Sequence, residues 1–238
     1  MSGFRLRQSG ARVDFIVNPV KAVKAASKHE LNSNVKRYII MNGQIKSRQR
    51  VSNFGEVYTA HRQVSDMLDL IPDDAAGISA TYLEPACGNG NFIVEILKRK
   101  FGMITTRNPW LYSVQQLRCV SSVYGVDIQK DNTVETVERI VRVYVKVYSD
   151  VFHCLPDRHI LEAVRNIASR NIVCGDTLTA TMKDGRPLIF HEWDIREDGR
   201  IFSAEYAFAE MLQNGGVGTT PVRRHRFRWL YNVASETA

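Results

Sequence analysis

The chain has 238 residues, of which 44% are hydrophobic and 24% are charged, a composition typical of an ordinary globular protein. No window approaches the roughly 18 uninterrupted apolar residues of a membrane span. The basic N-terminus lacks the apolar core of a secretory signal, so we expect a cytoplasmic protein. The four cysteines are scattered without a CxxC pair, which argues against zinc ligation and favours free thiols, so we expect no metal site.

The formal net charge is +7, and the positive charge is concentrated at the two ends of the chain. Residues 1–50 carry eleven Lys and Arg residues against Asp14 and Glu30, and the segment 223–229 reads Arg-Arg-His-Arg-Phe-Arg-Trp. Basic ends on a nearly neutral centre favour a polyanionic partner, because each phosphate contact releases counterions. A solvated, solubilising surface is the alternative, and charge alone does not separate DNA from RNA.

Taken in chain order, residues 1–50 show weak periodicity and predict a basic arm or small subdomain, with a short helix over 20–28 and a strand over 35–41. From residue 57 the hydrophobic pattern predicts regular helices and strands. In order, these are a helix to Ile71 with Thr59 as N-cap, a strand over 78–83, a helix over 92–100, a loop at Asn108–Trp110, a helix over 111–118, a strand over 120–128, helices over 131–147 and 157–169, and strands over 171–174 and 186–190.

This alternation is typical of an α/β fold with a parallel sheet and right-handed crossovers. The glycine-rich segment 214–220 resembles a flexible linker before the basic tail. We therefore divide the chain into an N-terminal arm (1–50), a central domain (51–213), and a linker with a basic, aromatic tail (214–238).

The strongest motif is Tyr82-Leu-Glu-Pro-Ala-Cys-Gly-Asn-Gly-Asn-Phe92, between a predicted strand and a predicted helix. Gly88 and Gly90 allow a sharp turn and a close approach of the backbone to a ligand. The following helix start presents free N–H groups to a negative or polar group. A lone Gly-x-Gly is a weak signal, but Glu84 at the strand end and the flanking residues add specificity.

This segment resembles motif I of amino (N6-adenine or N4-cytosine) DNA methyltransferases, especially the modification subunits of type I restriction systems and related phage enzymes. The resemblance implies a Rossmann-like domain in a bacterial or phage-infected cell, with S-adenosylmethionine (SAM) as cofactor. The implied cofactor-binding residues of this motif are Glu84, Pro85, Ala86, Cys87, Gly88, Gly90 and Phe92. A generic structural turn is the alternative interpretation.

A second segment, Phe54-Gly-Glu-Val-Tyr-Thr-Ala-His61, is similar to motif X of the same class, which precedes motif I. The family has Pro where this chain has Ala60, and Pro at a first helical position mainly preorganises the backbone. The resemblance implies that Tyr58 and Thr59 contact the carboxylate end of SAM. A simple helix cap would also explain Thr59.

Two further strand ends carry acids. Asp127, followed by Ile128, ends a predicted strand, where a carboxylate can accept hydrogen bonds from both hydroxyls of a ribose. Asp176 and Leu178 resemble motif III, whose acid contacts the adenine amino group beside an apolar neighbour. Plain strand-end or cap carboxylates are the alternative.

The sequence departs from the family at the catalytic tetrapeptide (Asp/Asn/Ser-Pro-Pro-Tyr/Phe), which is expected after the fourth strand and is not found there. The segment after the predicted strand 186–190 is His191-Glu192-Trp193-Asp194. It offers a hydrogen-bond acceptor, a general base, and an aromatic ring that could stack on a nucleobase flipped out of the duplex. A surface turn with a packed tryptophan is the other interpretation.

Too few residues follow Phe190 for a full methyltransferase sheet, so we expect about four to five strands and an edge that a second copy or a partner subunit could cover. In the tail, Arg223, Arg224, Arg226 and Arg228 are the expected nucleic-acid contacts.

The first functional hypothesis is SAM-dependent methylation of DNA, with adenine N6 as the preferred target. The second is an inactive SAM-binding or DNA-binding subunit that works through a partner in restriction-modification or anti-restriction. An RNA or protein methyltransferase is a third hypothesis.

Overall fold

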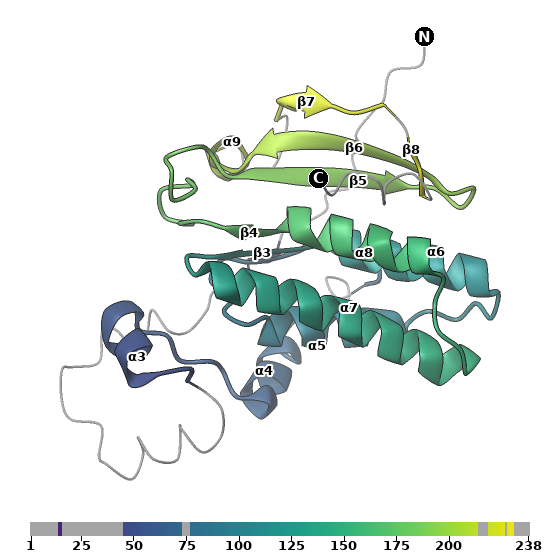
Figure 1. Ribbon diagram of the computed structural model, residues 1–238, viewed down its shortest axis with the longest axis horizontal. Coiled ribbons are helices and arrows are strands. Elements are labelled where there is room, and N and C mark those ends of the chain that lie inside the picture. The colour runs from purple at the N-terminus through teal and green to yellow at the C-terminus, as the bar shows by residue number, and fades with distance from the viewer. Residues whose placement is uncertain (1–13, 16–44, 73–76, 214–218, 227, 231–238) are drawn as a thin grey trace.

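The computed structural model describes residues 14–15, 45–72, 77–213, 219–226 and 228–230 (Figure 1). The helix expected over 20–28 and the strand expected over 35–41 lie outside these residues, as does most of the expected linker. Within the described parts the protein is a mixed α/β structure with one parallel and one antiparallel sheet.

The parallel sheet has the strand order β1-β2-β3-β4. Its strands are β1 (Asp14–Phe15), β2 (Tyr82–Glu84), β3 (Val123–Asp127) and β4 (Ile172–Cys174). The strands expected over 78–83, 120–128 and 171–174 are confirmed with shifted bounds, and they are parallel neighbours as expected. We call the edge where Glu84, Asp127 and Cys174 end their strands the carboxyl edge. Acidic and glycine-rich turns follow the strands there.

Seven helices are described: α3 (Arg48–Phe54), α4 (His61–Leu68), α5 (Asn91–Gly102), α6 (Pro109–Ser121), α7 (Lys130–Phe152), α8 (Arg158–Asn171) and α9 (Phe208–Gln213). Asn108 and Pro109 begin α6 instead of forming a loop, because the Asn108 side chain accepts a hydrogen bond from the backbone N–H of Leu111 at 3.0 Å. The N-cap of α4 is Ala60 and not Thr59.

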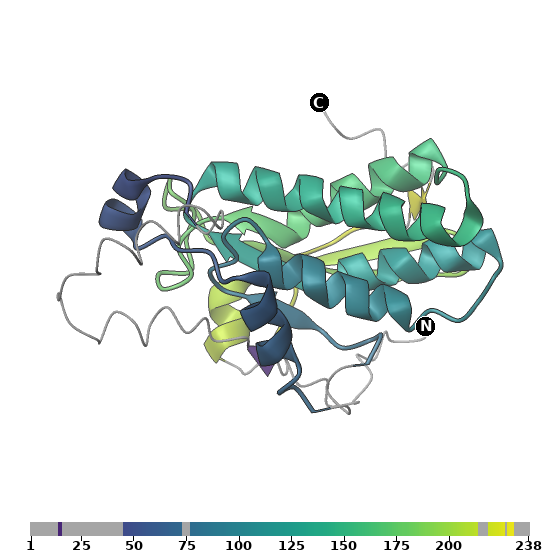
Figure 2. The same ribbon diagram turned by 90° about the horizontal axis from the view of Figure 1, so that it is seen from below.

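Helices α5 and α7 run side by side and cover one face of the parallel sheet (Figure 2). This face carries the main core, in which the rings of Phe101 and Tyr144 meet edge to face with centroids 6.0 Å apart. The opposite face presents Leu83 and Val126 to a second apolar cluster that includes Leu188, Phe190 and Phe208. Both faces of the parallel sheet are therefore buried, as such sheets require.

The antiparallel sheet was not expected from the sequence. It contains β5 (Ile189–Ile195), β6 (Arg200–Ala207), β7 (Arg223–Arg224) and β8 (Arg228–Trp229), with both short strands paired to β6. The strand expected over 186–190 is shifted to β5 and does not continue the parallel sheet. Strands β5 and β6 form a hairpin whose turn is closed by Gly199 in a left-handed conformation (φ 87°).

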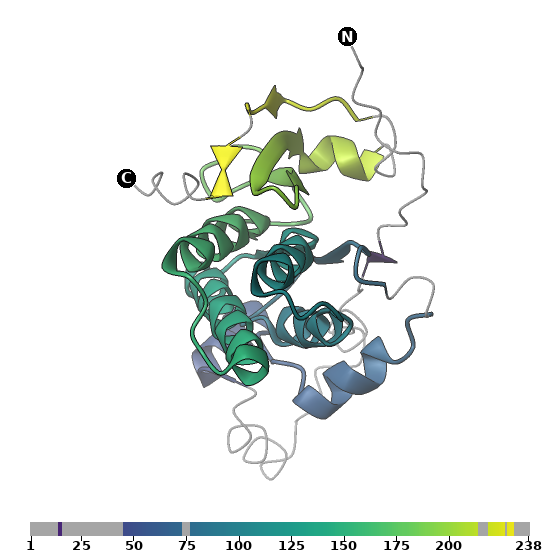
Figure 3. The ribbon, with the colours of Figure 1, turned by 90° about the vertical axis from the view of Figure 1, so that its right-hand side faces the viewer.

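The antiparallel sheet stacks on the helical layer, as the end view shows, and β5 contacts both α6 and α8 (Figure 3). Residues expected in a free C-terminal tail are thus strands of this sheet. Among the described residues, no helix has both the length and the apolar composition to cross a membrane.

Candidate functional site

The motif I segment forms a tight turn, which we call the glycine turn (residues 85–90), between β2 and α5. Gly88 and Gly90 have φ values of 53° and 87°, a left-handed backbone that favours glycine. A Cβ at Gly90 would lie 2.7 Å from Cγ2 of Thr136, so the close approach of α7 also requires glycine there. The turn forms as the sequence predicts.

The acid at the end of β3 lies against this turn. The backbone N–H of Gly88 donates a hydrogen bond to Oδ2 of Asp127 at 2.9 Å. Oδ1 of Asp127 accepts from the backbone N–H of Gln129 at 2.8 Å and from Nδ2 of Asn132 at 3.0 Å. Burial raises the pKa of Asp127 despite these three donors. The structure therefore brings the acid predicted to bind ribose, Asp127, into direct contact with the motif I turn.

Tyr58 of the predicted motif X covers one side of the glycine turn. Its side chain is buried, and a Cβ on Gly88 would lie 3.1 Å from the Tyr58 ring. The Tyr58 hydroxyl donates to Oε1 of Glu56 at 2.8 Å and lies 2.9 Å from Oδ1 of Asn132. Burial also raises the pKa of Tyr58, so the phenol stays protonated. The structure thus brings Tyr58 to the site, whereas Thr59 contributes only its backbone carbonyl, which accepts from Nδ2 of Asn91 at 2.9 Å.

Residues 45–58, which we call the cover segment, are attached to the start of α7 by ion pairs. Lys46 Nζ lies 3.0 Å from Oδ2 of Asp131 and 2.7 Å from Oε2 of Glu135. Arg50 bridges Asp131 at 2.5 Å and Glu56 at 2.6 Å. The hydrogen bond from Arg50 lowers the pKa of Asp131 to about 2. These contacts hold Tyr58 over the glycine turn.

Glu84 is the one deeply buried acid of the site, with 1% of its surface exposed. Oε1 accepts from the backbone N–H of Ala86 at 3.2 Å, whereas Oε2 is buried without a hydrogen-bond partner in the structure. Burial, with the nearby charge of Asp127 as a smaller cause, raises the pKa of Glu84 to about 8. A buried, unsatisfied carboxylate oxygen is costly unless a donor group reaches it.

The segment after β4 also meets the glycine turn. The hydroxyl of Thr177 donates to the carbonyl oxygen of Pro85 at 2.5 Å. The Asp176 side chain makes a hydrogen bond within its own loop, in which Oδ1 accepts from the backbone N–H of Leu178 at 2.8 Å. Leu178 is 77% exposed and Ile128 is 57% exposed. Two apolar side chains are therefore left in solvent at the carboxyl edge.

The other predicted residues of motif I have structural roles. Cys87 is buried, and its backbone N–H donates to the carbonyl of Val126 at 2.9 Å, which joins the turn to β3. Burial raises the pKa of the Cys87 thiol, which favours its protonated form. Phe92 is buried in the main core.

The structure does not bring His191, Glu192, Trp193 and Asp194 to the glycine turn. They lie within β5 and not in a turn after a strand. Trp193 donates from Nε1 to Oδ1 of Asn171 at 2.9 Å. Burial lowers the pKa of His191 to about 4.

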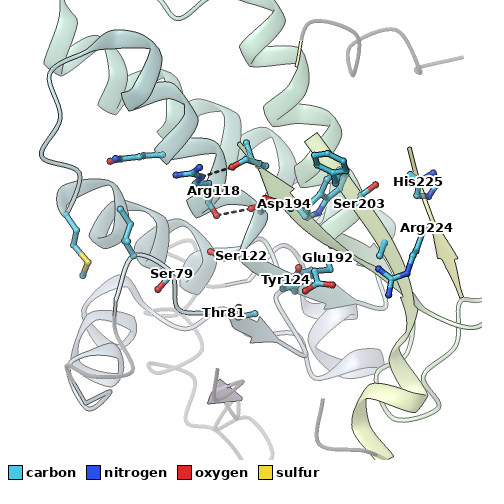
Figure 4. A pocket seen from close by; sticks show the side chains of 18 residues that line it. Ser79, Thr81, Arg118, Ser122, Tyr124, Glu192, Asp194, Ser203, Arg224 and His225 are labelled. Atoms are coloured by element: carbon cyan, nitrogen blue, oxygen red, sulfur yellow. Dashed lines mark hydrogen bonds between the residues drawn. The ribbon is translucent and has the colours of Figure 1, made fainter. Parts of the chain in front are cut away.

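Part of β5 lines a cavity of about 1210 Å³ together with Thr81 and Ser122, which precede β2 and β3 (Figure 4). This cavity therefore opens at the amino ends of the strands, opposite the carboxyl edge. The expectation that β5 supplies the catalytic group beside motif I is corrected by this topology.

The expected nucleic-acid contacts lie on the antiparallel sheet. Arg223 and Arg224 form β7 and are exposed, Arg226 is exposed, and Arg228 in β8 is half-buried. Arg224 also lines the large cavity. These arginines are held by a sheet instead of a free tail.

Sequence reasoning missed the contribution of α7. Asn132, Thr136 and Arg139 share one face of this helix. Asn132 donates to Asp127, whereas Thr136 and Arg139 contact the glycine turn itself. The hydroxyl of Thr136 donates to the carbonyl of Gly88 at 3.2 Å, and Nη1 of Arg139 donates to the carbonyl of Asn89 at 2.6 Å. Their spacing of four and three residues on a predicted helix is the signal that could have found them.

Comparison with known proteins adds nothing to this geometry. No family model, no curated protein and no solved structure matches the chain.

Proposed function

We propose that the chain binds SAM at the carboxyl edge of a Rossmann-like sheet and transfers its methyl group to an exocyclic amine of DNA, with adenine N6 preferred. The observation that carries the proposal is the hydrogen bond from Gly88 to Asp127, which unites two motifs that the sequence separates by 39 residues. Ligands of open α/β sheets bind outside the carboxyl ends of the strands, so the location agrees with the proposal.

The residues present fit the chemical groups of SAM. The unsatisfied Oε2 of Glu84 is an acceptor suited to the ammonium of the methionine part. Asp127 is placed at a strand end, where ribose hydroxyls are recognised. Exposed Ile128 and Leu178 offer apolar surface to an adenine ring. When bound, SAM supplies a methyl group on an already activated sulfonium.

The chain's own residues would bind SAM and orient it toward the target amine. The glycine turn gives close backbone approach, and Tyr58 with the cover segment excludes water from one side of it. Orientation of the two reacting groups supplies most of the rate in such a transfer, because it removes the entropic cost of bringing them together. The exposed arginines of β7 would hold the phosphate backbone of DNA.

Two measurements test the proposal. Calorimetry should detect SAM binding to the full chain and a loss of at least tenfold in affinity for Gly88→Val, whose side chain would collide with the Tyr58 ring. Tritiated methyl transfer from SAM to unmethylated DNA should occur with the wild type and with His191→Ala, and it should disappear in Gly88→Val.

The inactive-subunit hypothesis has one observation in its favour, which is that the catalytic tetrapeptide is missing. It predicts SAM binding without transfer to any DNA. Absence of SAM binding to the wild-type chain would overturn both functions.

A further inference from the structure

Three side chains on the antiparallel sheet converge away from the glycine turn. His191 in β5 lies directly opposite Glu205 in β6, and side chains of opposite residues share one face of a sheet. His225 follows β7, and its backbone N–H donates to the carbonyl of Ser203 at 2.9 Å. The hairpin and β7 therefore place these residues, which we call the His–Glu–His cluster, side by side.

The geometry of the cluster is that of a ligand set. One ligand atom from each residue lies within 4.8 Å of the other two, and all three residues are half-buried. Nε2 of His225 lies 2.6 Å from Oε1 of Glu205. The rings of His191 and His225 are nearly parallel, with an interplanar angle of 24° and centroids 6.0 Å apart.

His191 has an unused nitrogen in this arrangement. Its Nδ1 is buried and has no hydrogen-bond partner. A buried ring nitrogen without a partner is costly, and a cation would satisfy it. The His191 ring is itself fixed by stacking on Trp193 at a centroid distance of 5.3 Å.

We propose that the His–Glu–His cluster binds a divalent transition-metal ion, with Zn²⁺ as the expected occupant. Two imidazoles and one carboxylate suit Zn²⁺ and neighbouring first-row ions and do not suit Mg²⁺ or Ca²⁺, which take oxygen ligands. Zinc bonds to such ligands are about 2.0–2.2 Å long, so small side-chain rotations suffice to bring the three atoms onto one ion. Three protein ligands leave a coordination position for water or a substrate group.

The cluster also has features that oppose binding. Arg170 is close enough to act on the pKa of His191, and Arg223 lies opposite Glu205 in the register. Both positive charges weaken the attraction of a cation, so the site depends on its imidazole ligands. An ion held there would tie β5, β6 and the segment after β7 together, and this inference does not depend on the proposed function.

The test uses the full chain after treatment with a chelator. Calorimetry with Zn²⁺ should give one site, and Zn²⁺ should raise the melting temperature, whereas Mg²⁺ at the same concentration should do neither. His225→Gln and Glu205→Gln should each weaken Zn²⁺ binding at least tenfold. The control His61→Gln removes an exposed histidine of α4 and should leave the affinity unchanged.

A second measurement does not depend on the folding of any variant. Co²⁺ added to the wild type should give visible d–d absorption that one equivalent of Zn²⁺ removes, without the near-ultraviolet charge-transfer band of a cysteine thiolate. A thiolate band, wild-type affinity in both cluster variants, or no binding by the wild type would overturn the proposal.

Discussion

The backbone N–H of Gly88 and the carboxylate of Asp127 are joined by a hydrogen bond of 2.9 Å that links the turn after β2 to the end of β3. Asp127 is thereby the shared partner of a turn, a strand end and the first residues of α7. Its three donors hold the carboxyl edge in one arrangement, and this relationship makes the acid a structural element as well as a candidate ligand.

Replacing Asp127 should separate these two roles. Asp127→Ala leaves the N–H of Gly88 and the amide of Asn132 without their acceptor, so the free energy of unfolding should fall by about 1–3 kcal/mol in urea denaturation. Asp127→Asn retains an acceptor oxygen and should be destabilised less. Both variants should lose SAM affinity in calorimetry, and unchanged affinity in both would exclude Asp127 as a cofactor ligand.

Glu84 should make stability depend on pH. The folded state keeps the Glu84 proton to a pH of about 8, whereas the unfolded state releases it near the ordinary pKa of 4.5. The folded state therefore binds more protons between these values, and the contribution of Glu84 to stability falls as pH rises through this window. Glu84→Gln should flatten that part of the urea-unfolding profile. A slope equal to that of the wild type would contradict the buried, protonated carboxyl.

Cofactor binding should release the same proton. If a ligand ammonium approaches Oε2 of Glu84, the charged carboxylate is favoured, and a proton leaves at neutral pH. Calorimetry in buffers of different ionisation enthalpy should show proton release on SAM binding to the wild type and none for Glu84→Gln. Equal proton release by the wild type and Glu84→Gln would mean that a group other than Glu84 loses the proton.

The cover segment should open more often when its ion pairs are removed. Arg50→Ala breaks the links to Asp131 and Glu56 and leaves Glu56 without its cation. We expect faster amide hydrogen exchange in residues 46–58 and faster association of SAM. Arg62→Ala, a control at a 93% exposed side chain on α4, should change neither rate.

A substitution at Gly125 should destabilise the contact between β3 and α5. A Cβ there would lie 2.7 Å from Cδ1 of Ile93 and 3.1 Å from Sγ of Cys87. Gly125→Ala should therefore cost about 1–3 kcal/mol of unfolding free energy, as overpacked cores do. The matched control is Gly102→Ala, where no atom lies within 4 Å of the added Cβ. Equal stability of the two variants would contradict the described packing.

The exposed arginines should determine the salt dependence of DNA binding. Each phosphate contact contributes a slope of about 0.9 to the plot of log affinity against log salt for duplex DNA. Arg226→Gln and Arg224→Gln should each reduce this slope by about 1, whereas Arg62→Gln should leave it unchanged. Identical slopes in all variants would exclude this face as the contact surface.

The sequence predicted strands β2, β3 and β4 of the parallel sheet because their signals are local, whereas β1 was not predicted. The glycine turn needs positive φ at Gly88 and Gly90, and the strand before it is a short apolar run. Helix α7 has a continuous apolar face that includes Ile140 and Tyr144. Such patterns determine an element without knowledge of its neighbours.

The antiparallel sheet was not predicted, because the apolar run 186–190 favoured one further strand of the parallel sheet. Residues 189–195 mix aromatic and charged side chains, and their pairing with β6 depends on the turn at Asp198-Gly199. That dipeptide between alternating segments is a local hairpin signal. The cover segment and the roles of Lys46 and Arg50 depend on ion pairs between distant residues, which no local pattern reveals.

The pairing of β1 with β2 has a consequence for how the molecule is assembled. Asp14 and Tyr82 are far apart in the sequence, so their contact closes a long loop and adds to the folding barrier. During synthesis β1 emerges first, and its backbone groups have no strand partner until β2 has been made. Chaperones or a bound ligand that protect this exposed strand in the interval should raise the yield of native protein.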